Sequence, residues 1–554
     1  MKYYCNPMNL PYKYQLREEG YPNNREAADP TLIRFKGSYF LFPSMTAGFF
    51  TSEDLADWEF RPFIGQMPIY DYAPDVCAVG DWLYFSASNG QIRSYYRTKD
   101  PRSDGFEKIP ATFAFWDPHL FLDEDGRLYF YWGCSDKTPI CGVEVDTESL
   151  LPKCAPVDLI WGHPEKVGYE RMGEENVPHK AGALPYIEGP WMTKWGGKYY
   201  LQYAAPGTEF NVYADGVYEG DSPLGPFHLA KNNPYSFQPG GFITGAGHGS
   251  TLRDHDGNWW HTATMQISHN HPYERRMGLW RAGFDKDGEL YCDQRFGDWP
   301  KATADAPWDP PRWMLLSYRK PVRVSSGIHA ECAVDENIRT WWSAGCDQSG
   351  EWIEVDLGEA CQVHAIQINY ADEVIHALPD SDAVWSQDLG VPRVIEQRPL
   401  RIRWLLEGSV DGQIYFTIED KRHATTDLPH DLIIRENGFS CRFVRLTITE
   451  LPYHQNPKIS GLRVFGKGNG SAPARANAVG HRIGEMDAVI SWDTEHEVGA
   501  VILWGHAPDK LYHSRMVYGA NSGRITALIA GEDAYVRVDT FNEGGIAEGT
   551  VFKL

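Results

Sequence analysis

The sequence predicts an all-β protein, built as a five-bladed β-propeller followed by two β-sandwich domains. The 554-residue chain is long for a single hydrophobic core, so several domains are expected. The chain has 53 glycines, 37 prolines, 20 tryptophans, 30 tyrosines and 25 phenylalanines. This composition favours short strands joined by turns over long helices. A glycine-centred motif also recurs five times between Gly37 and Gly257 and then stops. These observations indicate a repetitive β domain that precedes non-repetitive ones.

Each copy of the motif places a glycine after a turn residue and before a run of aromatic and apolar residues, as expected for a hairpin. The copies are FKGSYFLF at Gly37, VGDWLYFS at Gly80, EDGRLYFYWG at Gly126, WGGKYYLQY at Gly197 and HDGNWWHTA at Gly257. Their spacing fits one four-stranded sheet per repeat. Five unconnected hairpins are the alternative, but they would leave many sheet edges unpaired. A closed propeller over residues 1–303 is therefore favoured.

The segment KATADAPWDPPRW is rich in proline and alanine, and we interpret residues 304–318 as a linker. Residues 319–468 then show short alternating strands, which predict a β-sandwich. The Gly/Ser/Pro stretch GKGNGSAPA separates a last domain, residues 469–554, that we interpret as a second small sandwich. The strands expected in the first sandwich are WIEVDLG, AIQINYA, WLLEGSVDG, FVRLTIT and GLRVFG.

Charge and cysteine usage restrict the partners and the compartment. The chain has 52 lysine and arginine residues and 75 aspartate and glutamate residues, which gives a formal net charge of −23. This charge repels phosphate backbones and anionic lipid headgroups, so neither a nucleic-acid nor a membrane partner is expected. No stretch approaches the roughly 20 apolar residues of a membrane span, and the first residues do not resemble a signal peptide. The ten cysteines lack CxxC spacing, so they predict free thiols rather than a zinc site or a disulfide framework. A cytoplasmic location follows, with secretion open if a leader has been removed.

A polar residue precedes each repeat glycine in otherwise apolar surroundings, and these residues are Asp29, Asp75, Asp117, Glu188 and His248. The first strand of each propeller blade lines the central channel, so we expect the five side chains to meet there. Glycoside hydrolysis needs a carboxylic acid and a carboxylate on either side of the scissile bond, and Asp29 and Glu188 can supply them. Asp117 can raise the pKa of the acid by like-charge repulsion. The alternative is that these carboxylates only accept backbone hydrogen bonds at strand starts.

The chain contains four short motifs in this order: Asp29-Pro, Ala73-Pro74-Asp75, Asp117-Pro118 and Glu188-Gly189-Pro190. Because of these motifs, the chain resembles glycoside hydrolase family 43 over about residues 1 to 300. The resemblance implies a five-bladed propeller and an inverting, exo-acting enzyme that releases a terminal pentose or furanose. It also implies that Asp29 is the general base, Glu188 the general acid, and Asp117 the residue that tunes and orients the acid. The sugar stays open among α-L-arabinofuranoside, β-D-xyloside and β-D-galactofuranoside.

The resemblance also suggests residues around the catalytic ones. His248, in GAGHGST, resembles a channel histidine near a calcium ion; the alternative is a neutral core histidine bonded to backbone. One of Arg275 and Arg276, in YERRMGL, is expected to contact the sugar and the acid, and the sequence does not decide which. We expect most aromatic residues near the site to pack in the cores of the blades. Candidates for sugar contact are Asp75, Phe49, Trp116 and Trp191.

The first sandwich contains the segments AVDENIRTWWSA, WIEVDLG, LEGSVDGQIYF and FVRLTIT. In these segments it resembles the discoidin, or coagulation-factor type C, fold. Asp335 lies in the loop where such domains hold a structural calcium. An insertion of roughly 30 residues between Tyr370 and Arg401 departs from the pattern. The last domain resembles a fibronectin type III fold, with Trp492 as its core tryptophan and Tyr535 in the corner position.

Other classes of protein are less consistent with the sequence. No GxSxG motif supports a serine hydrolase, and no HExxH accompanies His261, His269 and His271. GAGHGS lacks the spacing of a nucleotide-binding loop. The alternative function is a catalytically silent, lectin-like carbohydrate-binding protein, against which the retention of both carboxylates argues. In either case the expected partner is an oligosaccharide or glycoside, without an organic cofactor.

Overall fold

The computed structural model describes residues 1–554 except residues 19, 66–71, 89–94, 110–114, 179, 181, 374, 376, 380–392, 494 and 496. The described chain is almost entirely β-strand, with a few short 3₁₀ turns. No helix within it is long and apolar enough to cross a membrane. All ten cysteines are described, and none of them forms a disulfide.

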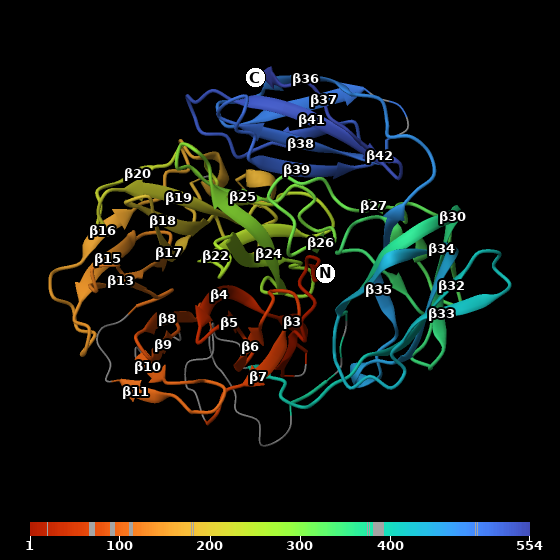
Figure 1. Ribbon diagram of the computed structural model, residues 1–554, viewed down its shortest axis with the longest axis horizontal. Coiled ribbons are helices and arrows are strands. Elements are labelled where there is room, and N and C mark those ends of the chain that lie inside the picture. The colour runs from red at the N-terminus through yellow and green to blue at the C-terminus, as the bar shows by residue number, and fades with distance from the viewer. Residues whose placement is uncertain are drawn as a thin grey trace.

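Five blades of four strands surround a common centre and form the propeller (Figure 1). Blade 1 consists of β4 (Ala28–Phe35), β5 (Ser38–Ser44), β6 (Gly48–Ser52) and β7 (Glu59–Pro62). Blade 2 consists of β8 (Asp75–Val79), β9 (Trp82–Ser86), β10 (Tyr95–Thr98) and β11 (Glu107–Ile109). Blade 3 consists of β12 (His119–Leu122), β13 (Leu128–Trp132), β15 (Ile140–Val145) and β16 (Val157–Ile160). The predicted fold class is therefore confirmed.

Blades 4 and 5 share one continuous sheet. Blade 4 consists of β17 (Ile187–Trp195), β18 (Lys198–Ala205), β19 (Ala214–Gly220) and β20 (Phe227–Leu229). Blade 5 consists of β22 (Thr244–Arg253), β23 (Trp259–Gln266), β24 (Arg275–Phe284) and β25 (Leu290–Asp293). A parallel pairing of β19 with β22 joins the two blades, and β14 (Cys134–Ser135) adds to the inner edge of blade 4. β14 therefore places Cys134 directly opposite Glu188.

The repeat glycines occupy the turns between the first and second strands of the blades, as predicted. Gly37, Gly80, Gly126, Gly197 and Gly257 all have positive φ, between 59° and 88°. A residue with a Cβ is strained in that conformation, which explains why glycine recurs at these turns. The aromatic runs that follow form the second strands β5, β9, β13, β18 and β23, whose side chains fill the cores between blades.

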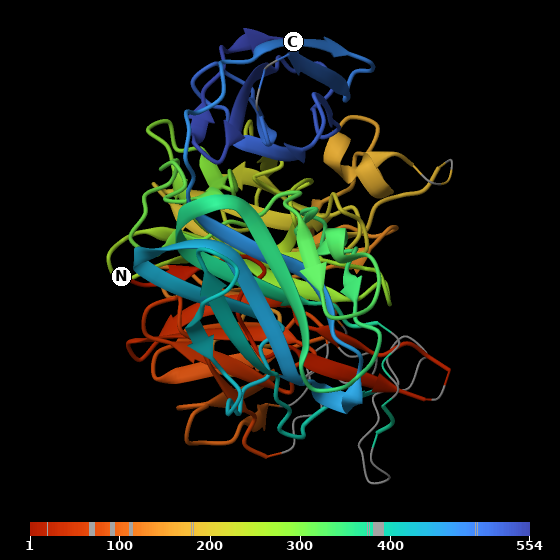
Figure 2. The same ribbon diagram turned by 90° about the vertical axis from the view of Figure 1, so that its right-hand side faces the viewer.

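The first sandwich, residues 314–467, faces the viewer in Figure 2. Its main sheet has the order β27-β35-β30-β34-β32-β33. These strands are β27 (Met314–Leu315), β30 (Glu351–Tyr370), β32 (Arg403–Ser409), β33 (Tyr415–Asp420), β34 (His430–Glu450) and β35 (Lys458–Lys467). The paired strands β30 and β34 pass through bulges between Asp356 and Cys361. Within the segment interpreted as a linker, Met314–Leu315 pairs with β35.

The second sandwich, residues 477–553, stacks two small sheets at the top of Figure 1. One sheet contains β36 (Asn477–Arg482), β37 (Ala488–Asp493) and β40 (Ser522–Ile525). The other contains β38 (Gly499–Gly505), β39 (His513–Tyr518), β41 (Tyr535–Asn542), β42 (Gly545–Ala547) and β43 (Phe552–Lys553). Trp492 of β37 is buried in the apolar cluster that the second sandwich forms together with blades 3 and 4 of the propeller.

Both sandwiches pack against the propeller through one shared apolar cluster. Trp299, at the end of the propeller, lies with its ring 5.6 Å from Phe465 of the first sandwich and 5.4 Å from Phe541 of the second. Arg463 of β35 forms buried ion pairs with Glu336 (2.7 Å) and with Asp298 of the propeller (3.3 Å). Because these groups are almost inaccessible to solvent, the three parts are held as one body by burial as well as charge.

Candidate active site

Three of the predicted site residues have a left-handed backbone, which non-glycine residues seldom adopt. Asp29 has φ 49°, Asp117 φ 48° and His248 φ 50°. The ladders that contain Asp29, Glu188 and His248 also shift register beside them. Such bulges redirect side chains out of the normal pleat. The strand starts of blades 1, 3, 4 and 5 are therefore built to present these side chains, and backbone strain of this kind is typical of functional sites.

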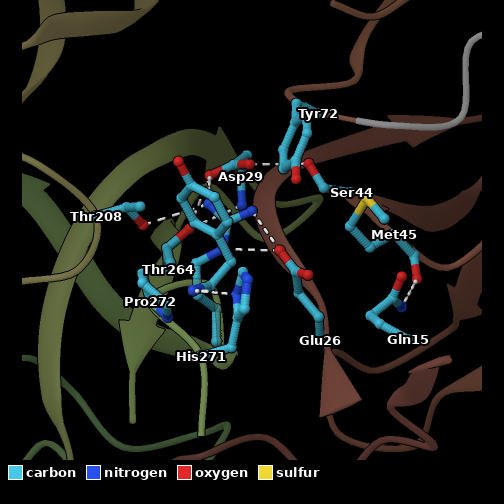
Figure 3. Close-up of polar contacts among 12 residues, drawn as sticks. Gln15, Glu26, Asp29, Ser44, Met45, Tyr72, Thr208, Thr264, His271 and Pro272 are labelled. Atoms are coloured by element: carbon cyan, nitrogen blue, oxygen red, sulfur yellow. Dashed lines mark hydrogen bonds and ion pairs between the residues drawn. The ribbon is translucent and has the colours of Figure 1, made fainter. Parts of the chain in front are cut away.

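Asp29 is buried and surrounded by donors from other strands (Figure 3). Ser44 donates to its Oδ2 at 2.8 Å, Thr264 to its Oδ1 at 3.3 Å, and Arg275 Nη1 to its Oδ1 at 3.1 Å. Burial alone raises the pKa of a carboxyl group, but the charges of Arg275 and His248 and these hydrogen bonds outweigh it. The pKa of Asp29 is lowered from 3.8, so the carboxylate is ionised at neutral pH and suited to accept a proton.

Asp117 and Glu188 form a close carboxylate pair with Cys134. One carboxylate oxygen of Asp117, one of Glu188 and the Cys134 sulfur all lie within 4.8 Å of one another. The Cys134 thiol donates to Glu188 Oε2 at 3.2 Å, and the Tyr213 hydroxyl donates to Oε1 at 2.5 Å. Burial, with the charges of Glu188 and Asp29, raises the pKa of Asp117 to about 7, although His248 opposes the shift. The pair therefore retains a proton close to neutral pH.

His248 lies between the base and this pair. Its Nδ1 is 3.6 Å from Asp29 Oδ1 and 3.7 Å from Asp117 Oδ2. Burial lowers the pKa of an imidazole, but the surrounding carboxylates outweigh burial and raise the pKa of His248 above 6.5. Asp215 of β19 fixes the strand by accepting the backbone N–H of His248 at 2.7 Å. His248 therefore lies in contact with both carboxylates, whose charges favour its protonated form.

The structure separates the two adjacent arginines. Arg275 points into the site: besides Asp29 it donates to Glu26 Oε1 (2.6 Å) and to Thr208 Oγ1 (3.3 Å). Arg276 points the other way, and its Nε donates to Nε2 of His430 in the first sandwich at 2.8 Å. Adjacent residues of a strand face opposite sides, so only one of the two can enter the channel. The expectation that Arg276 contacts the sugar is wrong, because its guanidinium is buried in the interface with the sandwich.

Asp75 does not join the carboxylate cluster through any described contact. Its Oδ1 lies 3.0 Å from Nδ1 of His119, and its Oδ2 accepts the Leu120 N–H at 2.8 Å. Both oxygens thus bind the first strand of the next blade. This contact ties blades 2 and 3 together, which is the role that the strand-start alternative predicted.

The three aromatic candidates differ in their surroundings. Phe49 is fully buried and stacks on Phe42 at 4.9 Å, so the expectation that it contacts sugar is wrong: no face of its ring is exposed. Trp191 is half-buried against His119, with ring centroids 4.3 Å apart, and donates to a backbone carbonyl. Trp116 is half-buried directly before Asp117, and its carbonyl accepts the N–H of Gly133.

Several residues of the site were not predicted from the sequence. Ser44, Thr264, Tyr213 and Cys134 hold the carboxylates, and each lies in a strand or loop outside the repeated polar position. Only the position of Ser44, at the end of the repeat-motif strand in blade 1, gave a local signal. The others come from blades distant in sequence, so their proximity depends on closure of the propeller.

The potential ligand atoms around His248 do not suit a directly bound calcium ion. Calcium takes about six to eight oxygen ligands, whereas Nδ1 of His248 faces two carboxylates and has a raised pKa. Among the described residues the only trio of potential ligands is Asp117, Cys134 and Glu188, and its thiol does not suit calcium. His248 is not part of that trio. The arrangement is better suited to protons than to a metal.

Fold and site together define the class: a five-bladed β-propeller whose centre holds an ionised carboxylate, a protonatable carboxylate pair and a histidine in contact with both. Residues 23–290 match the family model described as "Glycosyl hydrolases family 43". The match spans all four residues of this centre and covers most of the propeller. The propeller therefore carries the family-43 sequence pattern.

The proteins similar to the chain include the following two curated proteins and one solved structure. It is 24% identical over 241 residues to a beta-D-galactofuranosidase of Aspergillus niger, covering 36% of this chain and 62% of that protein. It is 29% identical over 244 residues to a xylan 1,3-beta-xylosidase of a Vibrio species, covering 42% and 41%. A thermostable family-43 glycoside hydrolase is similar at a TM-score of 0.43 and 22% identity, covering 55% of this chain and all of that one. The chain spans less than two thirds of the length of these curated relatives.

Proposed function

We propose that the protein is an inverting, exo-acting glycoside hydrolase that releases a terminal pentose or furanose from plant or microbial oligosaccharides. The observation that carries the proposal is the opposite tuning of two buried carboxyl groups at one centre. Asp29 has a lowered pKa, whereas Asp117, paired with Glu188, has a raised one. A base that is ionised and an acid that is protonated at the same pH are the two requirements of glycoside hydrolysis.

In this proposal Asp29 is the general base. It accepts a proton from the attacking water, and the donors Ser44, Thr264 and Arg275 hold its oxygens in place. Arg275 also keeps the carboxylate ionised before the reaction. After water attack the proton remains on Asp29 until product and proton leave together.

Glu188 is the general acid, which protonates the oxygen of the leaving group. Tyr213 and Cys134 each hold one of its oxygens, so its orientation is set by two neighbours. Asp117 accepts the N–H of Gly189 at 3.3 Å, which also positions the residue next to Glu188 in the chain. Repulsion between the carboxyl groups of Asp117 and Glu188 disfavours the state in which both are ionised, so the pair keeps one proton.

The substrate class rests on the relatives. The names beta-D-galactofuranosidase and xylan 1,3-beta-xylosidase describe enzymes that act on a furanoside and on a xyloside. We carry the shared chemistry, a terminal five-carbon or furanose sugar in glycosidic linkage, to this chain as the proposed substrate class. The partner is then an oligosaccharide or a smaller glycoside.

A panel of aryl glycosides tests this function. Purified protein incubated with 4-nitrophenyl α-L-arabinofuranoside, β-D-xyloside and β-D-galactofuranoside should release nitrophenol from at least one of them. A preparation that binds these sugars in calorimetry but releases no nitrophenol would support the lectin-like alternative and overturn the proposal. The Asp29→Asn variant serves as the control for contaminating activity.

For the two sandwiches we propose a discoidin-like fold and a fibronectin type III-like fold. Trp342 and Trp404 fill the core of the first, and Trp492 that of the second. Asp335 of the first sandwich is the proposed calcium ligand: burial raises its pKa to about 6, and its oxygens accept the Asn337 N–H at 3.0 Å and the Thr340 hydroxyl at 2.7 Å. If calcium binds there, it raises the melting temperature, a chelator reverses the rise, and Asp335→Asn abolishes it.

A further inference from the structure

The insertion in the first sandwich returns to the propeller. Its strand β31 (Arg393–Ile395) pairs antiparallel with β2 (Lys13–Arg17), which in turn pairs with β3 (Asn24–Glu26). Arg393 lies directly opposite Arg17 in this ladder. A short piece of the sandwich thus forms the edge of a three-stranded sheet that ends at Glu26, three residues before Asp29.

The side chain of Arg393 is buried and contacts Tyr72, Glu26 and Met45 of the propeller. Its Nη2 donates a hydrogen bond to the hydroxyl of Tyr72, and its guanidinium lies 4.8 Å from the centre of that ring. Its Nη1 is 3.9 Å from Glu26 Oε2. Tyr72 and Glu26 both appear beside Asp29 in Figure 3.

Glu26 connects this arginine to the proposed base. Its Oε1 accepts Nη2 of Arg275 at 2.6 Å and Nε at 3.1 Å, and Arg275 Nη1 donates to Asp29 at 3.1 Å. Tyr72 also lies under both guanidinium groups, 5.7 Å from that of Arg275. Arg393 and Arg275 therefore share one carboxylate and one aromatic ring.

The charges around Glu26 show what this sharing does. Arg275 and Arg393 contact Glu26 directly, and the charge of Arg17 also acts on it. His271 is held neutral, because burial and these three arginines lower its pKa to about 3. With Arg393 present, the charge of Glu26 is shared between the two arginines that contact it. Without Arg393 more of that charge acts on Arg275, and the repulsion between Arg275 and Arg393 is lost. Both changes favour movement of Arg275 toward Glu26 and away from Asp29.

We propose that Arg393, supplied by the sandwich, is a positioning residue of the active site, which acts through Glu26 and Tyr72 to keep Arg275 on Asp29. This inference rests on the proposed function. It makes the sandwich a structural part of catalysis, because the propeller alone would lack this arginine. The base then depends on a segment that lies more than 360 residues further along the chain.

Steady-state kinetics and a variant structure test the proposal. Arg393→Met should lower kcat by about ten- to a hundredfold, the size of loss expected when a catalytic group is misplaced by about 1 Å, with a smaller change in KM. Because weaker contact with Arg275 raises the pKa of Asp29, the acidic limb of the kcat/KM profile should move to higher pH. Arg393→Lys should recover part of kcat, and Tyr72→Phe should show a smaller loss in the same direction.

Arg171→Met is the matched control. Arg171 forms a two-point ion pair with Asp487 (2.7 and 2.8 Å) and so joins the propeller to the second sandwich away from the site. It should lower the melting temperature without moving the acidic limb. An unmoved limb and unchanged kcat in folded Arg393→Met would overturn the inference while leaving the hydrolase proposal intact.

A crystal structure of Arg393→Met gives a readout that does not require activity. We expect Arg275 to leave hydrogen-bonding distance of Asp29. If Arg275 stays near 3.1 Å from Asp29 Oδ1, the inference is overturned. Failure of the wild-type protein to hydrolyse any glycoside would instead contradict the proposed function.

Discussion

Asp29 and Asp117 are both buried aspartates with a left-handed backbone, yet their pKa values move in opposite directions. Burial penalises the charged form of each. At Asp29 that penalty is exceeded by Arg275, His248 and two hydroxyl donors. At Asp117, burial and the neighbouring carboxylates prevail over His248. The side chains next to each carboxyl group thus decide which of the two is a base and which belongs to the acid pair.

Removing either proposed proton-transfer group should abolish most of the activity and leave the fold intact. Asp29→Asn and Glu188→Gln should each lower kcat by roughly 10²- to 10⁴-fold, since each removes a general acid or base. The measurement is kcat on a substrate with a poor leaving group, alongside circular dichroism of each variant. Near wild-type turnover in either variant would remove that residue from its role.

Asp117→Asn should shift the alkaline limb of the kcat/KM profile to lower pH. Without the second negative charge, the proton of the carboxylate pair is lost more easily as the pH rises. The pH profile measured on a glycoside with a poor leaving group, whose departure requires the acid, checks this. A limb that stays in place would argue against a tuning role for Asp117.

The same substitution should stabilise the protein above neutral pH. The folded-state pKa of Asp117, about 7, is higher than its ordinary value of 3.8. The stability linked to its proton is therefore fully present below about pH 4 and is lost as the pH rises through 7. Melting temperatures of Asp117→Asn and wild type should agree near pH 4 and diverge in favour of the variant at pH 8. A less stable variant at pH 8 would contradict this reasoning.

At the scale of single elements, the first strands of the blades do two different tasks. In blade 2 the strand-start Asp75 binds the next blade, whereas in blades 1 and 4 the equivalent carboxylates face the site. Bulges in β4, β17 and β22 account for the difference in the site-forming blades. Close approach between neighbouring first strands then requires a small residue, and Gly189 provides it.

Gly189→Ala should impair both catalysis and stability. Gly189 has φ 58°, and a Cβ there would lie 2.7 Å from the ring of His248. The ring must move away from Asp29 and Asp117, so we expect kcat to fall at least about tenfold, with a loss of roughly 1–3 kcal/mol in stability. Kinetics and thermal unfolding measure the two effects.

Gly197→Ala is the matched control, because Gly197 also has positive φ (83°) but no atom lies within 4 Å of its added Cβ. It should cost stability by about 1 kcal/mol and leave kcat unchanged. Equal losses of kcat in both variants would mean that contact with His248 is irrelevant to activity.

At the scale of the whole molecule, the propeller and both sandwiches share an apolar cluster and buried ion pairs. The site itself combines residues from four blades, and the edge strand β31 adds a fifth source from the first sandwich. Proper assembly of all these parts determines the distances among the carboxyl groups. Those distances in turn decide the stereochemistry of the reaction.

The first product should have inverted anomeric configuration. Asp29 and Glu188 come from blades 1 and 4, and His248 contacts both Asp29 and Asp117, the neighbour of Glu188. We therefore expect the two carboxyl groups to stand far enough apart to admit a water molecule at the base. Inverting enzymes separate the two carboxyl groups by about 6.5–9.5 Å, whereas retaining ones use about 5–5.5 Å. Proton NMR of the initial product distinguishes these mechanisms. Retained configuration, or trapping of a methyl glycoside by methanol, would exclude Asp29 as the base.

Local chemistry along the chain was sufficient to predict the all-β class and the five repeats and to single out three carboxylates, because a turn glycine and a preceding polar residue recur in each repeat. It could not separate Arg275 from Arg276, since which face of β24 meets the channel depends on the register of the closed propeller. Nor could it relate Phe49 to the blade core or Arg393 to Asp29. Those contacts join segments that become neighbours only when the blades close and the sandwich docks, so the tertiary structure alone decides them.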